Sequence, residues 1–171
     1  MKAVSCSGGP ARGYRSALLA LILATSTLLL GTSLQPKSLE ELVREADLII
    51  RGTVQAVRPG PKGKGDPTTI VSVSVQQQWK GGQIATLRLV LPRGTERGIT
   101  RDVPGLPTFR TGEDVILFVV RESRGQYQIL GGKQGKFSIH TDQQSGREVI
   151  QDLTGTRSDL SEFLSRISRI K

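Results

Sequence analysis

The sequence predicts a mainly β protein: a small barrel of five or six antiparallel strands, with a short helix before it and an amphipathic helix after it. Three observations support this fold class. Several short segments alternate apolar and polar residues with the period of a β-strand. Glycines stand inside or between these segments, as is typical of strands that bend around a small barrel. Two further segments instead place their apolar residues on one face of a helix.

The first 33 residues have the pattern of a secretory signal peptide. Lys2, Arg12 and Arg15 precede the apolar run "ALLALILATSTLLL", and no acidic residue is present. The run has 14 residues, fewer than the roughly 20 needed to cross a bilayer core, which favours a cleaved signal over a retained anchor. Small residues predict cleavage after Ser33, with Ser26 as a competing position. The chain is therefore expected in the periplasm, at the cell surface or outside the cell, with membrane contact only through an uncleaved signal.

Residues 34–171 are expected to form one domain without disulfides. The only cysteine, Cys6, is lost with the signal, so the exported chain has neither a disulfide nor a thiol. Removing the signal leaves 21 Lys and Arg against 15 Asp and Glu, a net charge of +6. The basic residues are dispersed, and Trp79 is the single tryptophan, so the stacking surface of a single-strand binder is missing. Nucleic-acid binding is not expected.

The first elements are a short helix and a strand. In "SLEELVREA", Ser38 is followed three positions later by Glu41, the pattern of a capping box at the start of a helix. Residues 47–57 then alternate as a half-buried strand. Gly52 in the middle of this strand indicates a bulge or the close approach of another backbone. The proline- and glycine-rich stretch 58–68 is expected to be a loop.

The centre of the chain is expected to contain a hairpin, a long connection and a buried strand. Residues 69–79 and 84–92 are rich in strand-forming residues and flank the turn signal "KGG", which predicts a hairpin. The stretch 93–112 is interrupted by prolines and glycines and is expected to be irregular; connections of this length are typically functional or disordered. Residues 114–120, "DVILFVV", are continuously apolar apart from the first, which predicts a central strand covered on both faces.

The last third is expected to hold short strands and a terminal helix. Residues 125–141 are interpreted as a strand, a glycine break and a strand. Within them, "GGKQGK" at 131–136 lacks the P-loop pattern and precedes a strand, so we expect a bulged strand crossing and no phosphate site. "REVIQDL" predicts a last short strand. Residues 157–170 predict an amphipathic helix capped by Ser158 or Asp159, which we expect to dock on the sheet rather than on a membrane surface.

A five-stranded, partly open barrel is the oligomer-binding (OB) type of fold. "SLEELVREADLIIRGTVQAV", "VSVSVQQQWKG", "LPTFRTGEDVILFV" and "GGKQGKFSI" together resemble, over most of residues 38–139, a family of exported bacterial proteins of uncharacterised function. "EADLIIRGTV" followed by "QQQWKGG" is also similar to the first strands of the netrin-like domain, the fold of tissue inhibitors of metalloproteinases. The resemblance implies an OB/netrin-like barrel. Those inhibitors bind the protease zinc through an amino-terminal cysteine, which the exported chain lacks.

These features predict a non-enzymatic binding or accessory module. His140 is the only histidine, so it has neither a partner for a zinc site nor one for general base catalysis. Glu113 and Asp114 are adjacent, and on a strand they point to opposite faces, which makes them a poor acid and base pair. No catalytic residue, no metal and no cofactor are expected.

Two segments are the candidates for contact with a partner. Trp79 and Lys80 end a strand at the "WKGG" turn, where the indole either packs over the barrel end or anchors a partner. In the connection 93–112, prolines stiffen the backbone. This connection either seals the barrel end with Leu106 and Phe109 or presents two arginines, and sealing is favoured. The candidate contact residues are Trp79, Lys80, Arg101, Leu106, Phe109 and Arg110.

The partner class follows from the resemblance. The bacterial relatives that the chain resembles are often encoded near secreted metalloproteases. The resemblance therefore implies an inhibitor or chaperone of such a protease as an alternative function. Another envelope protein is the second candidate partner. A polyanion or cell-wall binder is less favoured. A protease contact would gather exposed apolar side chains near Trp79 and Leu106. A polyanion site would instead align four arginines on one face: Arg88, Arg93, Arg97 and Arg101.

Overall fold

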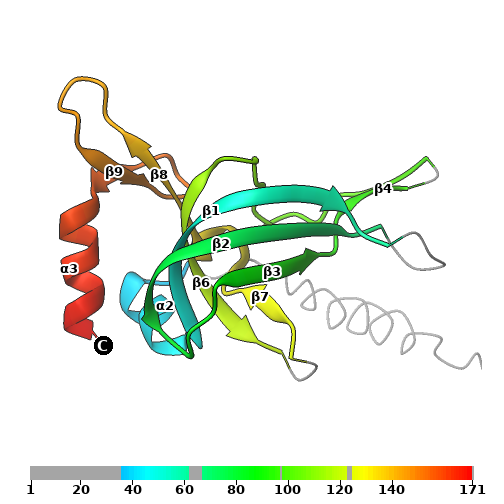
Figure 1. The fold of residues 1–171 in the computed structure, drawn as a ribbon, viewed down its shortest axis with the longest axis horizontal. Coiled ribbons are helices and arrows are strands. Elements are labelled where there is room, and N and C mark those ends of the chain that lie inside the picture. Colours follow the sequence, from blue (N-terminus) through cyan, green and yellow to red (C-terminus); the bar gives the residue numbers. More distant parts are fainter. Residues whose placement is uncertain (1–35, 62–66, 97, 123–124, 171) are drawn as a thin grey trace, which may run out of the picture. The chain divides into compact units, whose positions relative to one another are not determined.

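The computed structural model describes residues 36–61, 67–96, 98–122 and 125–170 (Figure 1). They belong to the unit Leu34–Lys171. The signal peptide expected over residues 1–33 lies outside the described residues. None of the described helices is long and apolar enough to span a bilayer.

The described residues form two α-helices, a single 3₁₀ turn and ten strands. The helices are α2 (Leu39–Glu45) and α3 (Leu160–Ile170), and the 3₁₀ turn is η1 (Gly132–Gly135). The longer strands are β1 (Leu48–Pro59), β2 (Thr69–Lys80), β3 (Thr86–Leu91), β6 (Asp114–Arg121) and β8 (Lys136–Thr141). The shorter strands are β4 (Gly94–Glu96), β5 (Ile99–Arg101), β7 (Tyr127–Ile129), β9 (Glu148–Gln151) and β10 (Arg157–Asp159).

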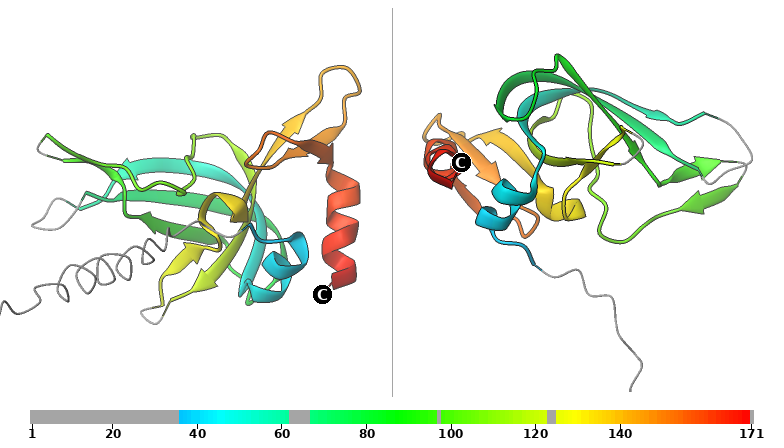
Figure 2. Two further views of the ribbon diagram at one scale, coloured as in Figure 1. Left: turned by 180° about the vertical axis from the view of Figure 1, so that it is seen from behind. Right: turned by 90° about the horizontal axis from the view of Figure 1, so that it is seen from below.

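Five strands close into a barrel in the order β1-β2-β3-β7-β6, and β6 pairs back with β1 (Figures 1 and 2). The expected OB/netrin-like barrel with a helix near each end of the domain is therefore confirmed. Four of the five pairings are antiparallel, and β3 with β7 is parallel, with Leu89 opposite Tyr127. A ring with an odd number of strands cannot alternate direction all the way round, so one parallel pair is unavoidable.

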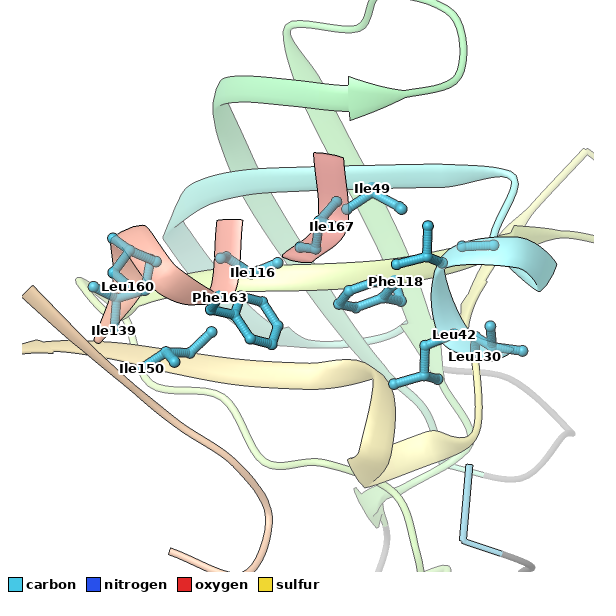
Figure 3. Packing of buried hydrophobic residues seen from close by; sticks show 12 residues of the cluster. Leu42, Ile49, Ile116, Phe118, Leu130, Ile139, Ile150, Leu160, Phe163 and Ile167 are labelled. Carbon is cyan, nitrogen blue, oxygen red and sulfur yellow. The ribbon is translucent and has the colours of Figure 1, made fainter. Parts of the chain in front are cut away.

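Strand β6 separates two hydrophobic cores, which explains its continuous apolar sequence. Val115, Leu117 and Val119 point into the barrel, whereas Ile116 and Phe118 point to the opposite face. The barrel core also takes the alternate residues of β2 and β3. The second core lies between the sheet and the two helices (Figure 3). Both faces of β6 are thus covered, as its composition predicts.

The second core is covered by α2 and α3, which contact each other on the same side of the sheet (Figures 1 and 2). Helix α2 begins with the expected capping box: the Ser38 amide donates to Glu41 Oε2 at 2.7 Å, and the Glu41 amide donates to Ser38 Oγ at 3.2 Å. Helix α3 contributes Leu160, Phe163 and Ile167 to the core. The terminal helix therefore docks on the sheet as expected.

Beyond the barrel, β8, β9 and β10 extend the sheet from the first half of β6. The helix expected from residue 157 begins at Leu160, because Arg157–Asp159 pairs with β9 as β10. Asp159 then caps the helix: its Oδ1 accepts from the amides of Ser161 at 2.8 Å and Glu162 at 3.3 Å.

Two glycine positions show why the chain needs that residue. A side chain on Gly52 would collide with the carbonyl oxygen of Ser74, and the β1–β2 register shifts beside it. The close approach expected there is confirmed. Gly132 has φ of +61°, and a Cβ on it would collide with the Gly105 carbonyl oxygen.

The segment "GGKQGK" is a correction to the sequence prediction, since it forms the 3₁₀ turn η1 and not a bulged strand crossing. This turn carries the chain from β7, which closes the barrel, to β8, which leaves it. The connection 93–112 also differs from the prediction, because its first part forms the small antiparallel sheet β4–β5. Three-residue strands are too short to produce a recognisable alternation in the sequence.

Candidate functional site

The structure uses Trp79 and Lys80 to join the end of β2 to helix α2. Trp79 is half-buried and packs against the core beneath the helices, not over the barrel interior. Lys80 Nζ donates to the carbonyl oxygens of Val43 and Arg44, both at 2.9 Å. These carbonyls belong to the last turn of α2, so the ammonium satisfies acceptors at the carboxyl end of the helix.

The contact candidates in the 93–112 connection lie in different surroundings. Phe109 is half-buried and packs against the barrel core, which fits the expected sealing role. Leu106 is half-buried, and its amide donates to the Val103 carbonyl at 3.2 Å. Arg110 is exposed beside a turn in which its amide donates to Glu113 Oε2 at 3.1 Å. Arg101 ends β5 with an exposed side chain.

These six candidates do not form one contact surface. Trp79 packs on the core under the helices and Phe109 on the barrel core. Within the part of the chain that the structure describes, the exposed large apolar side chains are Val57 at 36% and Leu153 at 53%. Val57 borders a hollow that Phe109 also lines, and Leu153 lies in a separate hollow to which the connection 93–112 contributes Gly105. Arg93 pairs with Asp102 at 2.9 Å, and Arg97 lies outside the described residues.

A groove of about 640 Å³ lies beside the helices and supplies a better candidate site. Its volume is within the range of about 300–1,000 Å³ typical of ligand sites. Four separate segments line it: the start of α2 with the residues before it, the turn η1 with the start of β8, the β9–β10 turn, and α3. Gly105, from the connection 93–112, completes one wall.

The floor of the groove is apolar. Phe137 lies between two aromatic neighbours, with its ring centroid 5.6 Å from that of Phe118 and 4.9 Å from that of Phe163. Figure 3 shows Leu42, Ile150 and Phe163 pointing into the core that continues from this floor. Leu153 adds the most exposed large apolar side chain of the described residues. The apolar lining consists of Leu39, Leu42, Phe137, Ile150, Leu153 and Phe163.

The rim of the groove carries three cations and one carboxylate. Lys37 Nζ pairs with Glu45 at 2.7 Å, and Arg166 pairs with Glu40 at 3.4 Å. Both of these glutamates lie outside the groove lining. The side chain of Lys133 lines the groove and has no ion-pair or hydrogen-bond partner among the described residues.

Asp152, the only acid in the lining, is occupied by its own turn. Its Oδ1 accepts from the Thr154 amide at 2.8 Å, the Thr154 hydroxyl at 2.7 Å and the Thr156 amide at 3.0 Å. This arrangement fixes the β9–β10 turn as a wall of the groove. That oxygen is thus engaged within the protein, and the described lining as a whole presents three cations and one carboxylate to a ligand.

Hydrogen bonds connect the turn η1 with the residue before α2 on one side and with Gly105 on the other. The Lys37 amide donates to Gln134 Oε1 at 2.5 Å, and the Lys133 amide donates to the Gly105 carbonyl at 2.8 Å. The hydrogen bond from the Ser38 backbone lowers the pKa of Glu41, which keeps the capping carboxylate ionised. The walls of the groove are therefore held by contacts within the protein itself.

Outside the groove, one cluster of ion pairs joins the strands β1, β6 and β9. Arg51 on β1 binds Glu148 at 2.5 Å and Asp114 at 2.7 Å, and these hydrogen bonds raise the pKa of the guanidinium. His140 is exposed on β8. In the residues that the structure describes, no three His, Cys, Asp or Glu side chains gather as metal ligands.

The groove residues were not foreseen from the sequence. A sequence signal exists only for Leu153, an apolar residue between the polar residues of the turn "DLTGT". A scan of protein-family models and a search of curated proteins find no match to this chain. The function is therefore inferred from the groove itself.

Proposed function

We propose that the protein is an exported, non-enzymatic binding module and that the groove between α2, η1, β10 and α3 is its ligand site. One observation carries the proposal: Leu153, 53% exposed, borders a groove with an apolar floor and a volume of about 640 Å³. An exposed apolar surface that is recessed and bordered by charges is typical of a binding site. The amino-terminal signal pattern supports export, and the barrel supports relationship to OB or netrin-like modules.

The charges around the groove support binding rather than catalysis. Catalysis of hydrolysis or group transfer needs a nucleophile beside a base, or an acid with a matched pKa. The acid in the lining, Asp152, accepts three hydrogen bonds from its own turn. The remaining charged side chains of the lining are the cations Lys37, Lys133 and Arg166. Such groups position an anion but do not form an acid and base pair.

A role toward a secreted protease is not the function that the geometry supports best. It would place exposed apolar side chains near Trp79 and Leu106, and both are half-buried. Of the exposed large apolar side chains among the described residues, Leu153 lines the groove, to which the connection 93–112 contributes only Gly105.

Binding of the neutral apolar dye Nile red to the exported protein tests the proposed site. The dye's fluorescence should increase saturably, and Leu153→Thr should weaken binding about fivefold, because it removes apolar contact surface from the groove. Val57→Thr is the matched control, since Val57 is the other exposed large apolar side chain of the described residues and does not line the groove. Equal effects of the two substitutions, or no saturable binding by the wild type, would reject the groove as the site.

A further inference from the structure

The rim of the groove favours an anionic ligand. Lys37, Lys133 and Arg166 line it, and the glutamates that pair with two of these cations lie outside it. The Lys133 ammonium has no ion-pair or hydrogen-bond partner among the described residues. Three cations and one carboxylate, Asp152, thus border an apolar floor in the described lining, and this excess of cations matches a molecule with one negative group and one apolar body.

The backbone around the groove favours a hydrocarbon chain over a peptide. A bound peptide main chain needs hydrogen-bond partners for its amides and carbonyls. Five amides of the groove lining already donate within the protein: those of Lys37, Lys133, Gln134, Thr154 and Thr156. An aliphatic chain needs no such partners and gains free energy from each methylene that it buries on Leu153, Phe137 and Phe163.

We propose that the groove binds a fatty acid, with the chain on the apolar floor and the carboxylate at Lys133. This inference rests on the proposed function and adds the class of ligand. The groove volume of about 640 Å³ accommodates one such chain, and the opening at the rim leaves the carboxylate in contact with water and with the Lys133 ammonium. An ionised carboxylate that keeps part of its hydration avoids most of the cost of burying a charge.

Isothermal titration calorimetry of the exported protein with sodium dodecanoate tests the ligand class. Dodecanoate should bind about tenfold more tightly than decanoate, because two further methylenes are buried. Dodecanol should bind more weakly than dodecanoate, and dodecyltrimethylammonium more weakly still, because the rim is cationic. Absence of dodecanoate binding, no dependence on chain length, or equal affinity for the cationic amphiphile would each overturn the proposal.

Substitution of Lys133 tests the position of the carboxylate. Lys133→Gln should weaken dodecanoate binding about threefold to fivefold, as expected for a solvent-accessible ion pair, and leave dodecanol binding unchanged. Arg169→Gln is the control, because Arg169 is an exposed cation of α3 that does not line the groove. An equal loss in both variants would show that the net charge attracts the anion and would reject Lys133 as its partner.

The failure of this inference can be distinguished from the failure of the proposed function. If Nile red binds in a manner that depends on Leu153 while dodecanoate gives no binding heat and does not displace the dye, the groove binds another apolar ligand and the fatty acid is rejected. If neither molecule binds, both proposals are rejected.

Discussion

At the scale of single residues, Lys136 holds the end of the proline-containing connection 93–112 in place. Its Nζ donates to Glu113 Oε1 and to the Thr108 carbonyl oxygen, both at 2.6 Å, and lies 4.7 Å from the centroid of the Phe109 ring. The side chains of Lys136 and Glu113 are only 11% and 16% exposed, so this ion pair is screened less than one on the surface. The loop is thus fixed against β8 by one largely buried cation.

Replacing Glu113 with Gln is expected to lower the free energy of unfolding by about 2 kcal/mol at neutral pH, because the largely buried Lys136 would lose its anion. Burial opposes ionisation of this carboxyl, but the hydrogen bonds from Lys136 and Ser138 outweigh it and hold the pKa of Glu113 below its ordinary value of 4.5. Chemical denaturation of both proteins measures the difference. Glu122→Gln, at an exposed carboxylate, is the control.

The ion pair between Lys136 and Glu113 also predicts that the free energy of unfolding depends on pH. A carboxylate whose pKa is lower in the folded state contributes stability in full above its unfolded pKa, and this contribution is lost as the pH falls through the folded pKa. The stability difference between wild type and Glu113→Gln should therefore be constant above about pH 5.5 and decrease below about pH 4.5. A difference that stays unchanged down to about pH 3 would show that the ionised form of Glu113 is not the stabilising one.

At the scale of elements, helix α3 forms both the cover of the second core and one wall of the groove. It begins at Leu160 and is capped by the preceding Asp159, whose Oδ1 accepts from the Ser161 amide and hydroxyl and from the Glu162 amide. The Ser161 hydrogen bond lowers the pKa of Asp159, in keeping with a carboxylate at a helix amino terminus. The start of the helix is therefore set by one side chain.

Asp159→Ala is expected to destabilise the protein by about 1 kcal/mol, whereas Asp159→Asn, which keeps an acceptor, should cost a few tenths. Amide hydrogen exchange followed by mass spectrometry should show faster exchange in α3 than in wild type, with β2 and β3 unaffected, because those strands belong to the barrel core. Uniform acceleration in all strands would instead mean that α3 does not open separately from the barrel.

The longer elements could be predicted from the sequence because each carries a complete pattern. Strand β6 has a continuous apolar run, β2 and β3 alternate, and α2 starts with a capping box. Strands β4, β5 and β10 have three residues each, which is too short for any period to be visible. The turn η1 was missed because glycines with positive φ suit a bulge and a 3₁₀ turn equally well.

The groove could not be predicted because it has no local pattern. Its lining comes from residues 36–42, 131–137, 150–158 and 163–166, which only the pairing of β6 with β8, β8 with β9, and the docking of the helices bring together. The charged residues of its rim are ordinary surface residues when taken singly. Two of the candidates chosen from the sequence, Trp79 and Lys80, connect β2 with α2. The sequence suggested that the indole either packs over the barrel end or anchors a partner, whereas it packs on the core beneath the helices.

At the scale of the whole domain, strand β6 contributes to two hydrophobic cores, one inside the barrel and one beneath the helices. The alternate side chains of β6 fill the closed barrel on one face and the space under α2 and α3 on the other. The barrel supplies a rigid frame, and the sheet extension β8–β9–β10 carries the turn that forms a wall of the groove. Because β6 contributes side chains to both cores, the barrel and the groove share one strand. Since α3 lines the groove, a ligand bound there is expected to protect α3 against local opening.

Two-dimensional NMR spectra of the isotope-labelled exported protein, recorded with and without Nile red, test the central claim most directly. The account predicts that chemical-shift changes gather at the groove, at Leu153, Phe137, Phe163 and Lys133, and leave the outer face of the barrel strands unchanged. Changes gathered instead around Arg88 and Tyr127, which border a separate hollow on that outer face, would contradict it.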